Sequence, residues 1–312
     1  MSLNHTKPLV AVIATGGTIA SQRGASGASA PTLTGQNLLA QMPRDKCQIR
    51  AIDLMAKDSA SFTLNDIQQI SEAVKIQLCD PEVAGVVVLH GTDAMEETAL
   101  LVHLQYQLAK PVIFTGAQFT SDHIKSDGPG NLSGAIAAAL CPEHARRGVL
   151  LHFASKLLPV WGTYKYSTER ADAFRQSKRI DSLSSPRLDG DISKIRVDIV
   201  AVYPGCDHTH MQASLAAGAN GIVLAALGSG NANPCLVEAV KDCTALDIPV
   251  VVSSRVPHGL LTSGYGGGGG GHDLAAAGAI HARILRPGQA RILLLALLAT
   301  GRDKEDIRAA FK

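Results

Sequence analysis

A short β-branched run, a glycine-containing turn and a helix-like segment recur along this chain, and this repeated unit most constrains its fold. The first run, Leu9–Ile13, precedes Thr15-Gly16-Gly17-Thr18, and Val86–Leu89 precedes His90-Gly91-Thr92-Asp93. Continuous apolar runs of this length predict strands that are buried on both faces. Strands that alternate with helices predict a parallel sheet, so we expect an α/β protein.

The same pattern continues to the end of the chain with one interruption. Further strands are predicted at 112–114, 149–153, 197–202, 221–226 and 249–253. Thr63-Leu64-Asn65-Asp66 resembles a capping box that begins a helix. The apolar spacing of 95–108 predicts another helix, with Glu96 and Glu97 suited to its first turn. Two more helices are predicted at 289–300 and 303–311. The break is Ser182–Lys194, which contains turn-forming Ser, Pro and Gly. We therefore predict two α/β domains: a larger N-terminal one at 1–181 with a mainly parallel sheet flanked by helices, a linker at 182–198, and a smaller parallel-sheet domain at 199–312.

Composition limits the classes of function. Hydrophobic residues make up 46% of the 312 residues, which is enough apolar surface for a folded core and excludes disorder as the main state. The formal net charge is only +2 and no basic stripe is visible, so nucleic acid is not an expected partner. No apolar run approaches the ~20 residues of a transmembrane helix, so no membrane association is expected.

The cysteines and the N-terminal segment bear on the compartment. Six cysteines are scattered without a C-x-x-C spacing, which favours free thiols in the reducing cytoplasm. Lys7, the apolar stretch 9–20 and Ala28-Ser29-Ala30 together resemble a secretory leader. Because Gly16-Gly17 interrupts that stretch, a buried strand followed by a turn is the favoured interpretation, and we expect a cytoplasmic protein.

Chemistry is expected at the strand ends, because ligands of open parallel sheets bind beyond the carboxyl ends of the strands. Three such ends carry hydroxyls or a carboxylate: Thr15, Thr92-Asp93 and Thr115. A threonine on a Gly-Gly turn is placed like a nucleophile, although a plain turn is the more common explanation of this pattern. The motifs of a P-loop and of a nucleophile elbow are absent. Asp207-His208-Thr209-His210 has no further ligand pair, so no metal is predicted.

Two longer segments resemble the signatures of the bacterial asparaginase/glutaminase family. They are 13–20, Ile-Ala-Thr-Gly-Gly-Thr-Ile-Ala, and 90–98, His-Gly-Thr-Asp-Ala-Met-Glu-Glu-Thr. Further matches follow in order at 110–112, 115–117, 127–132, 228–231, 253–257 and 289–291, so the resemblance covers about residues 8–311. It implies hydrolysis of the side-chain amide of asparagine, in some members also of glutamine, without a metal or cofactor. It also implies a homo-oligomer, a tight dimer that pairs into a tetramer.

The resemblance assigns catalytic roles to four positions. Thr15 matches the family's nucleophile, and Thr92 and Asp93 match its second threonine and the adjacent carboxylate. Lys165 matches the family's lysine by its spacing to Phe174. The chemistry agrees with these roles, because a threonine hydroxyl is a poor nucleophile until its proton is removed, and a lysine beside a threonine and an aspartate can relay protons. The resemblance thus implies a threonyl acyl-enzyme.

Further positions match the substrate-binding part of the family's site. Ser59 matches the serine that holds the α-carboxylate of the substrate, and we expect its neighbour Asp58 to belong to the substrate-binding site as well. Gly91 and Ala117 leave main-chain N–H groups open near the amide carbonyl, as an oxyanion hole requires. Asp93 has a second plausible role, since its charge would bind the α-ammonium group. Each residue also has a plain structural interpretation, as a helix cap or a turn residue.

The chain departs from the family pattern at two places. Many members carry a tyrosine on the loop after the first signature, but Ser21–Leu33 contains none. The acidic residue expected from a neighbouring subunit is also missing, because Gly259–Gly278 contains no Glu and instead holds Tyr265 and the glycine run 266–271. We hypothesise that Tyr265, or a residue of the 21–33 loop, takes the place of the missing partner of Thr15.

Alternatives to an asparaginase remain open at this point. A glutaminase-asparaginase of broader specificity differs only by one methylene of its substrate, which is worth ~1–3 kcal/mol and is not legible in the sequence. A non-catalytic amino-acid sensor on the same fold fits the missing Tyr and Glu, since fold does not fix function. The ammonia-releasing subunit of tRNA-dependent amidation carries an extra N-terminal domain, whereas the first signature here begins by residue 15.

Overall fold

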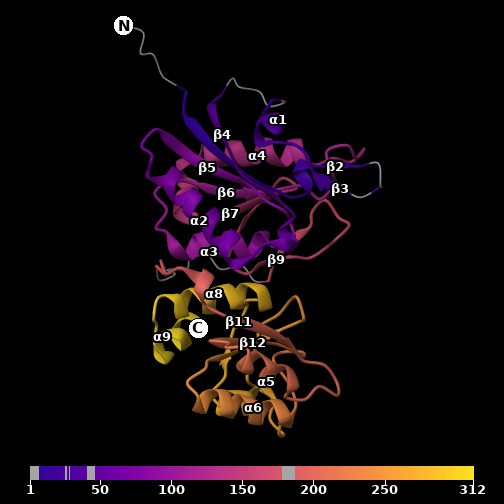
Figure 1. Cartoon of the computed structure of the whole chain (residues 1–312), viewed down its shortest axis with the longest axis vertical. Coiled ribbons are helices and arrows are strands. Elements are labelled where there is room, and N and C mark those ends of the chain that lie inside the picture. The colour runs from indigo at the N-terminus through magenta and orange to yellow at the C-terminus, as the bar shows by residue number, and fades with distance from the viewer. Residues whose placement is uncertain (1–6, 25–26, 28, 41–45, 178–186) are drawn as a thin grey trace. The chain divides into compact units, whose positions relative to one another are not determined.

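Buried β-branched runs form the central strands of two sheets, a mainly parallel one in the first of two compact units and a parallel one in the second (Figure 1). The computed structural model describes residues 7–24, 27, 29–40, 46–177 and 187–312, and its units are Met1–Arg175 and Gln176–Lys312. The predicted fold class, two α/β domains with the larger one first, is confirmed. Of the linker predicted at 182–198, residues 182–186 lie outside the described residues, and the remainder contains the 3-10 helix η4 (Ile192–Lys194). The domain boundaries stay a prediction.

The sheet of the first unit has six strands in the order β4-β1-β5-β6-β7-β8. Neighbours pair in parallel except β7 and β8, which form an antiparallel hairpin. The strands are β1 (Leu9–Gly16), β4 (Gln48–Lys57), β5 (Val83–Leu89), β6 (Val112–Thr115), β7 (Leu150–Phe153) and β8 (Lys156–Pro159). The four apolar runs predicted in this half are thus confirmed as strands, and the stretch 9–20 that resembles a leader is a buried strand followed by a turn.

Helices cover both faces of this sheet (Figure 1). Val10, Val12 and Ala14 of β1 share one core cluster with side chains of α1 (Gly35–Leu39) and α4 (Gly128–Ala139). The other face packs against α2 (Leu64–Cys79) and α3 (Met95–Gln105). Because side chains alternate along a strand, Ile13 of β1 belongs to the α2/α3 face, and the pairing of β1 with β4 becomes irregular after Ala14, at Thr15. The capping box predicted at Thr63–Asp66 begins α2 as expected.

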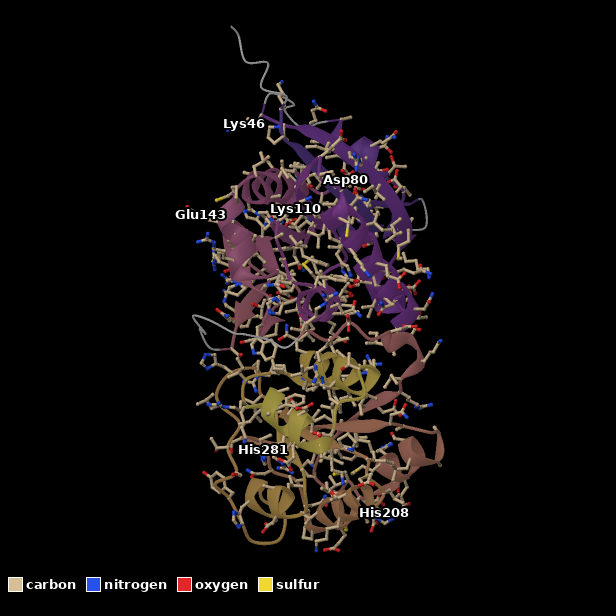
Figure 2. All side chains as sticks on the ribbon, turned by 90° about the vertical axis from the view of Figure 1, so that its left-hand side faces the viewer. Lys46, Asp80, Lys110, Glu143, His208 and His281 are labelled. Carbon is tan, nitrogen blue, oxygen red and sulfur yellow. The ribbon has the colours of Figure 1, made fainter. Side chains whose placement is uncertain are left out.

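The edge strand β4 was not predicted from the sequence. Its polar residues leave most of its side chains partly exposed, so it lacks the apolar run that identifies the central strands. Its beginning is held in place by Arg50, whose guanidinium lies 2.5 Å from the carboxylate of Asp80 at the end of α2. Lys110 donates to the carbonyl of Asp80, and these two labelled residues are neighbours in Figure 2. Ile49 and Ala51 of β4 still pack against the core of this unit, so the charged cluster adds to a smaller apolar contact than the central strands have.

The second unit is a four-stranded parallel sheet in the order β11-β12-β13-β14. Its strands are β11 (Val197–Ala201), β12 (Gly221–Ala226), β13 (Val250–Ser254) and β14 (Ile280–His281), and its helices are α5 (Thr209–Ala216), α6 (Pro234–Ala245), α7 (Gly271–Ala276), α8 (Pro287–Ala299) and α9 (Lys304–Ala310). The buried helix α8 packs on β11, β12 and β13. The three strands and two C-terminal helices predicted for this half are confirmed.

The glycine run is folded into a turn by side chains around it. The carboxylate of Asp273 accepts hydrogen bonds from the N–H groups of Gly268 and Gly270, at 2.8 and 2.9 Å. A Cβ atom at Gly270 would lie 2.0 Å from the carbonyl oxygen of Tyr265, so a side chain has no room there. The run thus ends at α7 in a defined turn that presents Tyr265. Among the residues that the structure describes, no helix has the length and apolar character needed to cross a membrane.

Gly85 provides a test of the packing between β5 and α4. A Cβ atom at Gly85 would lie 2.1 Å from the carbonyl oxygen of Ala139, and a main-chain atom in a packed core moves away only at a cost. Gly85→Ala should lower the free energy of unfolding by ~1–3 kcal/mol, as overpacking does.

The matched control is Gly130→Ala, since a Cβ atom there meets nothing within 4 Å. Alanine favours a helix over glycine by ~0.5–1 kcal/mol, so this variant should be neutral or stabilised. Urea unfolding of both variants gives the two values, and equal stability of both would contradict the close packing of Gly85.

Candidate active site

Thr15 is the last-but-one residue of β1 and lies beside the end of β5. Ala14 pairs with Leu89, so the residues that follow the two strands are neighbours. The Thr15 side chain is fully buried, and its hydroxyl donates a 2.8 Å hydrogen bond to the carbonyl oxygen of Leu89. A carbonyl fixes the hydroxyl proton but does not remove it, so Thr15 is oriented in this structure without being activated.

The turns after β1 and β5 approach each other through bare backbone. A Cβ atom at Gly17 would lie 2.4 Å from the Cα atom of Gly91, and one at Gly91 would lie 2.5 Å from the Oγ atom of Ser59. Gly17 also has a φ of 77°, in the region that disfavours side chains. The predicted nucleophile turn, the second signature and the Ser59 turn are therefore brought together, and only glycine fits at 17 and 91.

Lys165 joins Thr92 and Asp93 in one hydrogen-bonded group. It is the last residue of the short strand β9 (Thr163–Lys165), and its Nζ atom lies 2.8 Å from Thr92 Oγ1 and 2.5 Å from Asp93 Oδ1. Thr92 is buried, whereas the Asp93 side chain is 54% exposed. Because Lys165 donates to Thr92 Oγ1, the hydroxyl proton of Thr92 is free to point elsewhere. An exposed carboxylate beside this group is available to a cationic ligand.

Ser59 begins a 3-10 turn, η2 (Ser59–Ser61), that follows β4. Its Oγ atom is buried and has no hydrogen-bond partner among the residues that the structure describes. A buried hydroxyl without a partner is costly, which indicates that a ligand or water completes it. Asp58 is exposed, and its carboxylate accepts from the N–H of Ala60 as the cap of the turn. Its place in the substrate-binding site stays a prediction.

The turn after β6, which contains Ala117, is held by the side chains of Asp127, the N-cap residue of α4, and of Asn131 in α4. The carboxylate of Asp127 accepts from the N–H groups of Gln118 and Phe119, at distances of 3.0–3.1 Å. The amide of Asn131 donates to the carbonyl of Gly116 at 3.0 Å. Asp127 and Asn131 lie in a segment that resembles the family, but no role was predicted for them. The structure indicates that they fix the position of Ala117.

His90 is a buried residue whose contacts the sequence analysis missed. Burial lowers its pKa to about 4, so the ring is neutral at pH 7. Nδ1 lies 2.7 Å from the carbonyl oxygen of Gly91, which can only accept, so Nδ1 carries the proton and Nε2 accepts from Thr98 Oγ1 at 2.9 Å. The imidazole therefore orients the peptide group between Gly91 and Thr92. Its position inside a signature segment was the only sequence signal.

Glu96 is a second contact that the sequence did not reveal. Its Oε2 atom accepts a 2.7 Å hydrogen bond from the main-chain N–H of Lys165. Burial raises the pKa of Glu96 to about 8, although that hydrogen bond opposes the rise. The first turn of α3 is thereby attached to the strand that carries Lys165. In the sequence, Glu96 was explained fully by the preference for acidic residues in a first helical turn.

Tyr265 belongs to the second unit, where 64% of its surface is exposed. Its role as a partner of Thr15 stays a hypothesis. The 21–33 loop forms a two-stranded ribbon, β2 (Ser21–Arg23) with β3 (Ser29–Pro31). Within the described ranges, no three His, Cys, Asp or Glu residues are grouped as metal ligands.

Both halves of the sequence match known protein families. Residues 9–190 match the family described as Asparaginase, N-terminal, and residues 196–311 match the Glutaminase/Asparaginase C-terminal domain. The protein therefore belongs to the asparaginase family, which confirms the resemblance found in the sequence.

Individual relatives cover nearly the whole chain. The present chain is 36% identical to a probable L-asparaginase of Deinococcus radiodurans over 326 residues, which cover 97% of each chain. It is 29% identical over 327 residues to L-asparaginase 2 of Escherichia coli (strain K12), with 97% of this chain and 92% of that protein covered. Among solved structures, the probable cytoplasmic L-asparaginase from Campylobacter jejuni matches with a TM-score of 0.86 and 27% identity, covering 98% of this chain and 99% of that one.

The raised pKa of Glu96 predicts a pH dependence of stability. Its folded pKa of about 8 exceeds the ordinary 4.5, so its contribution to stability is complete below pH 4.5 and is lost as the pH rises through 8. Glu96→Gln removes this titration and keeps an acceptor for the Lys165 N–H. Between pH 5.5 and 9, wild type should therefore lose roughly 1–3 kcal/mol of unfolding free energy relative to the variant, less than the full shift because the side chain is only partly buried.

Urea unfolding at the two pH values measures this difference. Glu72→Gln, a change of the same kind at an exposed position of α2, serves as the control and should follow wild type at both pH values. If Glu96→Gln also follows wild type, Glu96 is not protonated in the folded protein at neutral pH.

Proposed function

We propose that this protein is an L-asparaginase, which hydrolyses L-asparagine to L-aspartate and ammonia. The observation that carries the proposal is the hydrogen-bonded group of Lys165, Thr92 and Asp93 beside the strand end of Thr15. The substrate class is supported by membership of the asparaginase family. It is also supported by relatives that are named L-asparaginase or probable L-asparaginase and match this chain over nearly their whole length.

We infer that the reaction is a double displacement through Thr15. The hydroxyl leaves the Leu89 carbonyl, its oxygen bonds to the side-chain amide carbon, and its proton passes to the relay. The amide nitrogen gains a proton and departs as ammonia, leaving a β-aspartyl ester on Thr15. Water then attacks the ester carbon, its proton returns to the Thr15 oxygen, and L-aspartate is released. Thr92 and Lys165 are the proposed relay, since Thr92 has a free hydroxyl proton and Lys165 holds its oxygen.

The substrate's charged groups have complementary sites in this proposal. The exposed carboxylate of Asp93 binds the α-ammonium group, and the unpartnered Ser59 hydroxyl donates to the α-carboxylate. Main-chain N–H groups near Gly91 and Ala117 stabilise the charge that develops on the amide oxygen. No metal or cofactor has a step in this reaction.

The compartment and assembly are proposed on narrower grounds. A cytoplasmic location is supported by six free cysteines and by the Campylobacter relative, which is named as probably cytoplasmic. A dimer of dimers is proposed from the family resemblance alone, and sedimentation of the purified protein tests it.

Ammonia release tests both the function and the nucleophile. Wild type should release ammonia from L-asparagine, and Thr15→Val, which keeps the shape and removes the hydroxyl, should lose at least ~10³-fold in turnover. Thr15→Ser is the matched control, because it keeps the hydroxyl and should retain measurable activity. Mass spectrometry of quenched enzyme should find the aspartyl adduct on residue 15, and an adduct on any other residue would refute the assignment.

The same assay with L-glutamine separates the alternatives. Comparable rates with both amides would make the protein a glutaminase-asparaginase. Binding of L-asparagine without any ammonia release would make it an amino-acid sensor and would reject the proposed function.

Tyr265→Phe tests the proposed partner of the nucleophile. If its phenol takes part in proton transfer at Thr15, removing only the hydroxyl should lower kcat by ~10²-fold or more. Tyr203→Phe is the control, since Tyr203 is another exposed tyrosine of the second unit. Unchanged turnover of Tyr265→Phe would remove this residue from the mechanism and direct attention to the 21–33 loop.

A further inference from the structure

We propose that Asp66 is a positioning residue that sets the affinity of this site for the α-carboxylate of its substrate. It does so by closing the turn that presents Ser59. The inference rests on the proposed function, in which Ser59 binds that carboxylate.

One carboxylate joins the two residues that flank the Ser59 turn. Asp66 Oδ1 accepts from Nζ of Lys57 at 2.6 Å, and Oδ2 accepts from the N–H and the hydroxyl of Thr63 at 2.9 and 2.8 Å. Lys57 ends β4 and Thr63 caps α2, so residues 58–62 form a loop whose two ends meet at Asp66. The position of Ser59 depends on that closure.

Asp66 is ionised and buried at the centre of these contacts. Only 7% of its side chain is exposed. Burial opposes ionisation, but the hydrogen bonds from Lys57 and Thr63 outweigh it and hold the pKa of Asp66 below its usual value. The carboxylate therefore binds both ends of the loop at neutral pH.

Lys57 also connects the loop to the nucleophile turn. Its carbonyl accepts a 3.1 Å hydrogen bond from the N–H of Gly17, and a Cβ atom at Gly16 would lie 2.4 Å from the same oxygen. The main chain of Lys57 is thus fixed against the turn that follows Thr15. Because Asp66 binds both Lys57 and Thr63, the other end of the loop, at Thr63, is held at a fixed distance from that turn.

A capping role alone does not explain these contacts. A capping box accounts for the bonds between Asp66 and Thr63, but not for the 2.6 Å contact with Lys57. The Lys57 side chain is 48% exposed, and an ion pair with an exposed member adds little to stability. The consequence of the contact should therefore appear in substrate binding more than in stability.

Steady-state kinetics of Asp66→Asn test the proposal. Asparagine keeps an acceptor for Thr63 and removes the charge that holds Lys57. We expect KM for L-asparagine to rise about tenfold while kcat stays within about twofold of wild type, because a small displacement of Ser59 weakens binding and leaves Thr15 in place. Lys57→Met breaks the same contact from the other side and should give the same change, even if Asp66→Asn folds poorly. Glu72→Gln, an exposed acid of the same helix, should leave both constants unchanged.

Two competitive inhibitors separate positioning from general damage. Succinamate has the amide and the carboxylate of asparagine but no amine, whereas β-alaninamide has the amide and the amine but no carboxylate. Asp66→Asn should raise the inhibition constant of succinamate by the same factor as KM and leave that of β-alaninamide within about twofold. An equal change in both constants, a fall in kcat at constant KM, or unchanged kinetics in both Asp66→Asn and Lys57→Met would overturn the proposal.

The proposed function and this inference fail in different ways. Wild type without ammonia release rejects the enzyme, but calorimetric binding of L-asparagine and succinamate still tests Asp66. If wild type is active and both Asp66→Asn and Lys57→Met keep its KM and kcat, only the positioning role of Asp66 is rejected.

Discussion

The candidate site depends on the close contact of the turns that follow three strands, at two glycines that have no side chain. Gly17 lies against Gly91, and Gly91 lies against Ser59, at separations that leave no room for a Cβ atom. The parallel register of β1 with β5, in which Ala14 pairs with Leu89, brings two of these turns together, and β4 on the other side of β1 brings the third. A side chain at 17 or 91 would separate the hydroxyls of Thr15 and Ser59 from the second signature. The close packing of these turns is therefore the first requirement of the site, and the charged groups depend on it.

Much of this arrangement could be predicted from the sequence. The apolar runs identified the buried strands, because strands covered on both faces contain little else, and the signature segments identified Thr15, Thr92 and Asp93 as one group. The edge strand β4 was missed because it has no such run: Ile49 and Ala51 pack against the core, and charged contacts such as Arg50 with Asp80 join the strand to the end of α2. Pattern reasoning detects burial, whereas these contacts join residues that are 30 positions apart.

The supporting residues were missed for a different reason. Glu96 looked like an ordinary acidic residue of a first helical turn, and Asp66 looked like half of a capping box. Both descriptions are correct, but each leaves one oxygen contact unexplained: Glu96 with the N–H of Lys165, and Asp66 with Lys57. When the position of a residue in a helix already explains its type, the sequence does not reveal a further contact with a distant segment. Such a contact is seen only in the three-dimensional structure.

These residues follow one rule at the beginnings of three helices. Asp66 at α2, Glu96 at α3 and Asp127 at α4 each use a carboxyl group to hold a neighbouring segment that carries part of the site. The helix start fixes the direction of such a side chain, and the carboxyl group has an oxygen to spare for a donor outside the helix. The sheet brings the strand ends together, and the helix starts then fix the loops that follow them. The groups proposed to meet the substrate, Thr15, Ser59 and Thr92, can therefore be small hydroxyls, because other side chains determine where they lie.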